Sequence, residues 1–139
     1  GLSEAVIFAG SVDNAETASY YNASDIFVFP TLTVEGLPFV LLEAMACGKP
    51  IIASEIGGTV EAIQGGENGI LIKPGDKAAI TRQIAALIHD RNLAERLGSA
   101  AEATVRRDFS IERMIDLTEK EMHRIADESA PSSIVRTGL

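Results

Sequence analysis

The order of structural elements is decided by residues 25–54, which read DIFVFPTLTVEGLPFVLLEAMACGKPIIAS. Two short apolar runs, 25–29 and 50–54, flank a stretch at 38–47 that is long enough for about three helical turns. Both runs are apolar at successive positions, which is typical of parallel strands buried on both faces. The stretch 38–47 stops at Gly48, a residue that commonly ends helices. The segment therefore predicts a βαβ unit, in which a helix connects two parallel strands.

The same alternation continues on both sides of this segment. Further apolar runs occupy 5–9 and 69–73, and further helical stretches occupy 14–23 and 59–64. Together they give the order βαβαβαβ. The sequence therefore predicts an α/β fold with a Rossmann-like, doubly wound parallel sheet.

After residue 75 the pattern becomes wholly helical. Asp76 and Ser110 can cap two helices, and between them another helix begins at Asp90 or Arg91 and runs to about residue 107. Apolar residues recur at helical spacing in all of these segments. We expect C-terminal helices that close the sheet, a domain over residues 1–128, and a flexible tail over 129–139.

Composition limits the class of protein. The 139 residues contain 12 Lys and Arg against 20 Asp and Glu, a net charge of −8, and 46% are hydrophobic. Such a chain can bury the core of one globular domain, and its acidity argues against a nucleic-acid surface. No apolar run approaches the roughly 18 residues of a membrane span, so we expect a cytoplasmic location. One cysteine, Cys47, and two histidines, His89 and His123, provide neither a disulfide nor a zinc-ligand spacing.

The loop after the run 25–29 is the candidate binding segment, because ligands of open α/β sheets bind beyond the carboxyl ends of the strands. Pro38 suits the first helical position, where its missing N–H would be unpaired in any case. The helix start then offers unpaired amides and the positive end of the helix dipole, an anion site suited to a pyrophosphate. The amides belong to Gly36, Leu37, Phe39 and Val40.

Glu43 is the one charged residue in the stretch 38–47. A helix apolar all round is buried, so we expect Glu43 to be buried and to accept hydrogen bonds. It lies about 7–8 Å along the helix axis from Pro38, which allows Glu35 to act near phosphates while Glu43 reaches sugar hydroxyls. Two structural alternatives stay open. Glu35 can be an ordinary acid at a helix start, and Glu43 can be a carboxylate bonded to a neighbouring segment.

These residues resemble the C-terminal, donor-binding domain of the GT-B glycosyltransferases of family 4, also called group 1. Glu35 and Glu43 match the family's two glutamates separated by seven residues, the EX7E motif. The surrounding pattern, including Gly57-Gly58 and Pro74-Gly75-Asp76, extends the resemblance over roughly residues 5–128.

The resemblance implies transfer of a hexosyl or related group from a nucleotide-diphospho-sugar, with retention at the anomeric carbon and with neither metal nor cofactor. Glu35 is then expected to be catalytic beside the donor sugar, and Glu43 to bind the nucleotide ribose. Amides of residues 36–40 would hold the sugar and phosphates, and Val12 would line the base. Many members have Gly where this chain has Pro38, which removes one amide donor.

The resemblance also implies an N-terminal acceptor domain and, at the start of the C-terminal domain, two further strands with a basic loop. This sequence, which starts at Gly1, contains neither part. We therefore expect a piece of a longer enzyme, or an oligomer in which another chain completes the sheet. In the family's strand order, residues 5–9 would form an edge strand separated from 25–29 by the two absent strands. The isolated chain is expected to be inactive. The full-length enzyme would take a glycan, lipid or small-molecule acceptor in carbohydrate biosynthesis, and peripheral membrane association is compatible with that role.

Two other functions share these features. One is a non-catalytic nucleotide-sugar-binding module, and the other is an epimerase or phosphorylase of GT-B fold, whose His or Lys finds no obvious match here. Gly57-Gly58 can be a tight turn with no ligand contact. The sequence leaves the donor base, the sugar and the acceptor open.

Overall fold

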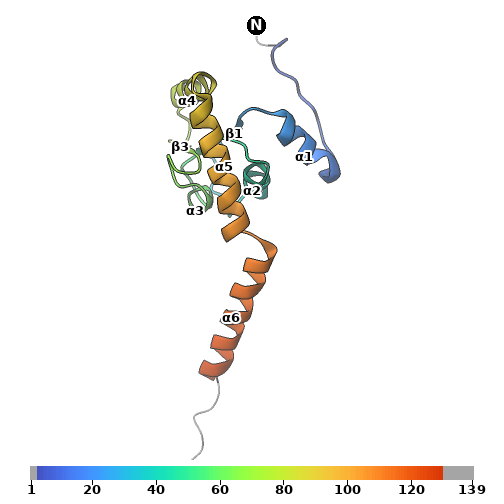
Figure 1. The fold of residues 1–139 in the computed structure, drawn as a ribbon, viewed down its shortest axis with the longest axis vertical. Helices are drawn as coiled ribbons and strands as arrows, with labels where there is room; N and C mark the ends of the chain where they lie inside the picture. Colours follow the sequence, from blue (N-terminus) through green and yellow to red (C-terminus); the bar gives the residue numbers. More distant parts are fainter. Residues whose placement is uncertain (1–2, 130–139) are drawn as a thin grey trace, which may run out of the picture.

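The computed structural model describes residues 3–129, which form a parallel sheet covered by helices, with one helix extending away from it (Figure 1). The strands lie in the order β1-β2-β3 and all pair in parallel. This architecture confirms the predicted α/β fold class. The elements are α1 (Asn14–Ala23), β1 (Phe27–Phe29), α2 (Phe39–Ala46), β2 (Ile51–Ser54), α3 (Thr59–Ala62), β3 (Ile70–Ile72), α4 (Lys77–His89), α5 (Arg91–Asp108) and α6 (Ile111–Ser129).

The central strand β2 is buried on both faces. Ile51 and Ala53 pack in the cluster that contains α2, whereas Ile52 packs in the cluster that contains α4. Successive side chains of a strand point to opposite faces, so a helical layer on each side requires apolar residues at every position. The continuous apolar run in the sequence reflects this two-sided burial.

Helix α5 joins the two halves of the core. Leu97 packs with α4 on one face of the sheet, and Ala101 and Val105 pack with α2 on the other. Between these contacts, Gly98 lies so close to the carbonyl of Gly48 that a Cβ on Gly98 would overlap it. The helix therefore rests directly on the turn that follows α2.

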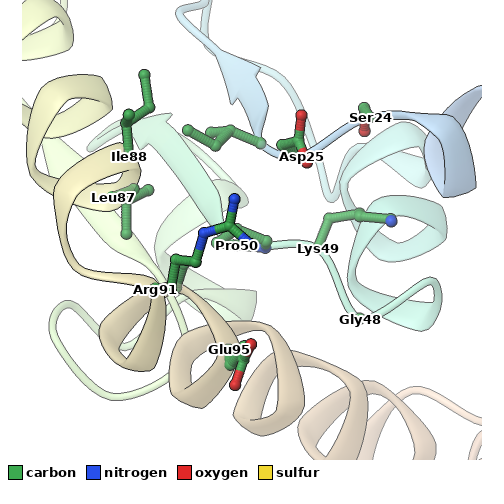
Figure 2. A pocket seen from close by; sticks show the side chains of 11 residues that line it. Ser24, Asp25, Gly48, Lys49, Pro50, Leu87, Ile88, Arg91 and Glu95 are labelled. Carbon is green, nitrogen blue, oxygen red and sulfur yellow. The ribbon is translucent and has the colours of Figure 1, made fainter.

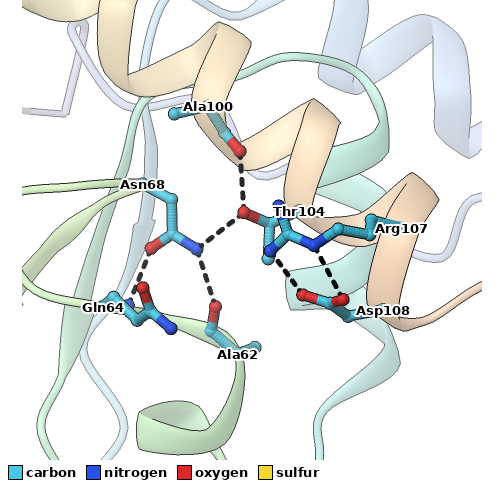
Figure 3. Close-up of polar contacts among 7 residues, drawn as sticks. All are labelled: Ala62, Gln64, Asn68, Ala100, Thr104, Arg107 and Asp108. Atoms are coloured by element: carbon cyan, nitrogen blue, oxygen red, sulfur yellow. Dashed lines mark hydrogen bonds and ion pairs between the residues drawn. The ribbon is translucent and has the colours of Figure 1, made fainter.

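A buried asparagine connects the loop after α3 to α5 (Figure 3). Asn68 is 3% exposed, and its Nδ2 donates to the carbonyl of Ala62 at 2.9 Å and to Thr104 Oγ1 at 3.2 Å. Its Oδ1 accepts from the amide of Gln64 at 2.7 Å. One side chain thus satisfies three polar groups, of which the bond to Ala62 is buried and those to Gln64 and Thr104 are part-buried.

The predicted starts of the C-terminal helices are confirmed. The side chains of Asp76, Asp90 and Ser110 each accept a hydrogen bond from the amide three residues later, at 2.8, 2.9 and 3.1 Å respectively. Each side chain satisfies one of the amides that a helix start leaves unpaired. Helices α4 and α6 therefore begin at their predicted caps, and α5 begins at Arg91, one of the two predicted starts.

The predicted strand at residues 5–9 is wrong. This segment pairs with no strand among residues 3–129, and Ile7 and Phe8 are 90% and 93% exposed. A β-strand is stabilised by backbone hydrogen bonds to a neighbour, and the edge of β1 lies away from this segment in Figure 1. The described sheet accordingly has three strands instead of the predicted four.

Helix α6 differs from the expected closing helix. It extends away from the sheet in Figure 1, and the side chains of residues 111–128 are exposed. His89 and His123 lie on the surface. Apart from Ser129, which ends α6, the predicted tail lies outside the described residues. Among residues 3–129, none of the helices combines the length and apolar character needed to cross a membrane.

Candidate functional site

The loop at residues 30–38 and the start of α2 lie at the carboxyl edge of the sheet, directly after β1. Pro38 has φ −73° and ψ 122°, an extended conformation, and its carbonyl accepts from the amide of Leu41 at 3.1 Å. Pro38 is therefore the residue before the helix, and the prediction that it is the first helical residue is wrong by one position. The extended ψ turns the chain into the helix, and Phe39 becomes its first residue.

The start of α2 brings together the predicted backbone donors. Within residues 3–129, four amides at this position donate to no protein acceptor, those of Gly36, Leu37, Phe39 and Val40. The side chain of Phe39 is 80% exposed, so the approach to these amides is open to solvent. Unpaired amides and the helix dipole favour an anion at this position.

Glu35 is exposed and lies in the same loop. Its Oε1 accepts from Thr31 Oγ1 at 3.3 Å, and its backbone carbonyl accepts from the amide of Gly58 at 3.0 Å. The main chain of Glu35 is thereby held while its carboxylate keeps lone pairs for a ligand.

The pair Gly57-Gly58 packs closely against the backbone of the loop that carries Glu35. A Cβ on Gly58 would lie 2.5 Å from the carbonyl carbon and oxygen of Gly36, and a Cβ on Gly57 would lie 2.5 Å from the carbonyl oxygen of Glu35. Gly57 also has a φ of +56°, which side chains disfavour. The sequence shows the two glycines but not their partner, so the tight-turn interpretation omitted their contact with the loop that carries Glu35.

Glu43 is exposed, so its predicted burial is wrong. Helix α2 packs through Leu41, Ala44 and Met45, and the face that carries Phe39 and Glu43 has no core partner among residues 3–129. The apolar composition predicted burial all round, but only one face is covered. Because water solvates an exposed carboxylate, Glu43 does not need the several hydrogen-bond partners that a buried carboxylate requires.

The carboxylate of Glu43 has one partner that the sequence did not indicate. Tyr21, on α1, donates from its Oη to Glu43 Oε2 at 2.9 Å. Burial of the phenol, together with this hydrogen bond and the negative charge of Glu43, raises the pKa of Tyr21 to about 12. A tyrosine in a helix with little apolar periodicity offers no sequence signal for this pairing.

Two further contacts fix α1 against its neighbours. The ring of Tyr21 meets that of Phe27 edge to face, with centroids 5.6 Å apart. Lys49 donates from Nζ to the carbonyl of Asn22 at 3.0 Å, in the last turn of α1. A cation at the end of a helix also complements the helix dipole.

Comparison with known proteins identifies the family of the chain. The sequence profile described as glycosyl transferases group 1 matches residues 1–104. The chain belongs to this family. The parallel sheet and helical C-terminus are those of the C-terminal domain of GT-B glycosyltransferases, as the resemblance indicated.

One sequence relative and two structural neighbours illustrate the similarity. Phosphatidyl-myo-inositol mannosyltransferase of Mycobacterium leprae is 37% identical over 112 residues, which cover 80% of this chain and 30% of that protein. Sucrose-phosphate synthase from Thermosynechococcus elongatus has a TM-score of 0.81 at 32% identity, over 93% of this chain and 32% of that one. HepE from Anabaena, in complex with UDP-glucose, has a TM-score of 0.74 at 26% identity, over 80% and 30% of the two chains. The chain thus spans about a third of the length of these proteins.

Val12, the remaining predicted site residue, lies in the segment before α1 and is half-buried. Its contact with a nucleotide base stays a prediction. Cys47 follows α2 as a half-buried free thiol. Within residues 3–129, His, Cys, Asp and Glu side chains form no group of three or more that could hold a metal ion.

A separate hollow of about 370 Å³ lies at the opposite, amino edge of the sheet (Figure 2). It is lined by residues just before β1 and β2, among them Asp25 and Lys49, and by Arg91 and Glu95 of α5. Parallel strands place these residues at the end of the sheet remote from the loop 30–38. The hollow carries charges of both signs, so it selects neither an anion nor a cation.

Proposed function

We propose that this chain is the donor-binding domain of a retaining, metal-independent glycosyltransferase that takes a hexosyl or related group from a nucleotide-diphospho-sugar. The observation that carries the proposal is the start of α2, where unpaired amides and two exposed carboxylates, Glu35 and Glu43, lie at the carboxyl edge of a parallel sheet. The structural neighbour HepE, solved with UDP-glucose, supports a nucleotide sugar as the donor.

In the proposed mechanism the amides at the start of α2 bind the diphosphate. They stabilise the negative charge that grows on it as the bond to the sugar breaks. The amides of Gly36 and Leu37 lie in a loop held by Gly58, so these donors need little reorganisation when charge develops. The diphosphate thereby becomes a better leaving group.

The two glutamates take different parts of the donor. Glu35, next to the amides, lies beside the donor sugar, where its carboxylate stabilises positive charge at the anomeric carbon. Glu43 lies in the second turn of α2 and binds the ribose hydroxyls through Oε1, since Oε2 already accepts from Tyr21. Val12 contacts the base, and neither a metal nor a cofactor takes part.

The acceptor, a glycan, lipid or small molecule, binds in this proposal to an N-terminal domain of the longer enzyme. The enzyme acts in the cytoplasm in carbohydrate biosynthesis, with peripheral association to a membrane where the acceptor is a lipid. This chain alone then binds the donor without transferring the sugar.

Calorimetric titration with UDP, GDP and their glucose and mannose conjugates tests the proposal. We expect weak binding of at least one nucleotide sugar and a loss of about tenfold in affinity in Glu43→Ala. Glu119→Ala is the matched control, because Glu119 is exposed on α6 and its side chain makes no hydrogen bond among residues 3–129. The absence of any nucleotide binding, equal affinity in Glu43→Ala, or sugar transfer by this chain alone would each contradict the proposal.

A further inference from the structure

Tyr21 is the one side chain that donates a hydrogen bond to the Glu43 carboxylate among residues 3–129. We infer that Tyr21 is a positioning residue, which orients Glu43 so that its free oxygen, Oε1, meets the two ribose hydroxyls of the nucleotide. The inference rests on the proposed function of Glu43. It adds to that function a residue from another helix, α1, that never touches the donor.

The geometry gives the carboxylate a fixed direction. Tyr21 Oη lies 2.9 Å from Glu43 Oε2, a normal distance for a hydroxyl donating to a carboxylate. Glu43 is exposed, so without this bond its side chain would sample several rotamers. A carboxylate that must accept from two adjacent hydroxyls binds best when its orientation is set beforehand.

The phenol is itself held in place. The Tyr21 ring packs edge to face on Phe27, and Phe27 stacks on Phe29 with centroids 6.4 Å apart. Both phenylalanines belong to β1, the strand that leads directly into the loop with Glu35. The same strand, β1, therefore supports the Tyr21 ring that orients Glu43 and leads into the loop that carries Glu35.

The phenol also remains a donor at every working pH. The pKa of Tyr21 is raised to about 12 by burial and by the interaction with Glu43, so the hydroxyl stays protonated in neutral and mildly basic solution. Since it is held to Oε2, the lone pairs of Oε1 remain available to a ligand.

A purely structural role for the same hydrogen bond makes a different prediction. In that case the bond fastens α1 to α2, and its loss loosens the whole region without regard to the ribose. Lys49 already joins α1 to the turn after α2 through the carbonyl of Asn22. Helix α1 therefore keeps a second contact near α2 when the Tyr21 hydroxyl is removed. The effect of that removal on ribose binding can then be measured with α1 still in place.

The test compares a ribonucleotide with its analogue that lacks the two ribose hydroxyls. The probes are UDP or GDP, whichever binds the wild-type chain more tightly, and the corresponding 2′,3′-dideoxynucleotide. Tyr21→Phe removes the hydroxyl and keeps the ring on Phe27. Tyr20→Phe is the matched control, because Tyr20 is the adjacent residue of α1, is 53% exposed and makes no side-chain hydrogen bond among residues 3–129.

We expect Tyr21→Phe to weaken binding of the ribonucleotide by about five- to tenfold and binding of the dideoxynucleotide by less than about twofold. Glu43→Ala should reduce the preference for the ribonucleotide at least as much. Addition of Tyr21→Phe to Glu43→Ala should change nothing further, because the two residues act through one contact. Tyr20→Phe should keep wild-type affinities, and the unfolding midpoint of Tyr21→Phe should stay within a few degrees of wild type.

The outcomes separate failure of this inference from failure of the proposed function. If Glu43→Ala reduces the ribose preference while Tyr21→Phe leaves it unchanged, or weakens both nucleotides equally, the positioning role of Tyr21 is wrong and Glu43 keeps its role. If Glu43→Ala leaves the ribose preference unchanged, or neither UDP nor GDP binds, the proposed function of Glu43 is wrong and the inference falls with it.

Discussion

Substitution of Gly58 by alanine tests how the donor loop is held. Gly58 has φ −66° and ψ −9°, a conformation that alanine adopts readily, so the backbone of Gly58 itself is not strained by the change. The added Cβ would lie 2.5 Å from the carbonyl carbon and oxygen of Gly36 and 2.6 Å from the amide nitrogen of Leu37. Any effect of Gly58→Ala therefore comes from contact with the neighbouring loop.

The magnitude follows from these distances. Ordinary contacts of a Cβ begin near 3.4 Å, so the loop at 35–37 must move away by roughly 1 Å. Overpacking of this kind lowers the free energy of unfolding by about 1–3 kcal/mol. The hydrogen bond from the amide of Gly58 to the carbonyl of Glu35, now 3.0 Å, would lengthen as well. A shift of about 1 Å in groups that position a substrate can reduce the rate about a hundredfold.

Urea denaturation and nucleotide calorimetry measure the two effects. We expect Gly58→Ala to lose about 2 kcal/mol of unfolding free energy and to bind nucleotide at least tenfold more weakly. Gly65→Ala is the control, because a Cβ on Gly65 meets only the side chain of Leu71, at an ordinary 3.8 Å. Wild-type stability together with wild-type nucleotide affinity in Gly58→Ala would refute the reasoning.

Three further predictions follow from the fold and from Tyr21. Asn68→Ala should lower the free energy of unfolding by about 2–3 kcal/mol in denaturant titrations, because the groups it satisfies at Ala62, Gln64 and Thr104 lose their partner; a change below about 0.5 kcal/mol would contradict this. Gly98→Ala should destabilise although alanine favours helices by about 1 kcal/mol, since its Cβ would overlap the carbonyl of Gly48; a rise in melting temperature would show that α5 can shift. The pKa of Tyr21 is raised from 10.0 to about 12, so the folded chain holds the phenolic proton more tightly than the unfolded chain. Stability should therefore fall between about pH 10 and pH 12, and Tyr21→Phe should flatten that part of the profile; equal slopes in both proteins would contradict it.

Much of the fold could be predicted from local patterns. The helix at 14–23 has the predicted bounds, and Asp76 caps α4 as expected. These features depend on neighbours within a few residues, where spacing and capping act. The strand at 5–9 could not be judged in the same way, because its formation depends on a partner that the local sequence does not specify.

The candidate site likewise combines features that the local sequence determines with features that it does not. The sequence determined that Gly36, Leu37, Phe39 and Val40 precede or begin a helix after a strand, and hence that their amides gather at one point. It also determined the spacing of Glu35 and Glu43, which places Glu35 in the loop before the helix and Glu43 within the helix. These are properties of a single continuous segment.

Only the tertiary structure decided what meets that segment. Glu43 is exposed and bonded to Tyr21, although the composition of its helix predicted burial, because burial depends on which face another element covers. Gly58 contacts Gly36 from a loop 22 residues away in the chain. Contacts between segments arise from packing of the whole fold, whereas sequence periodicity reports only which residues share a face.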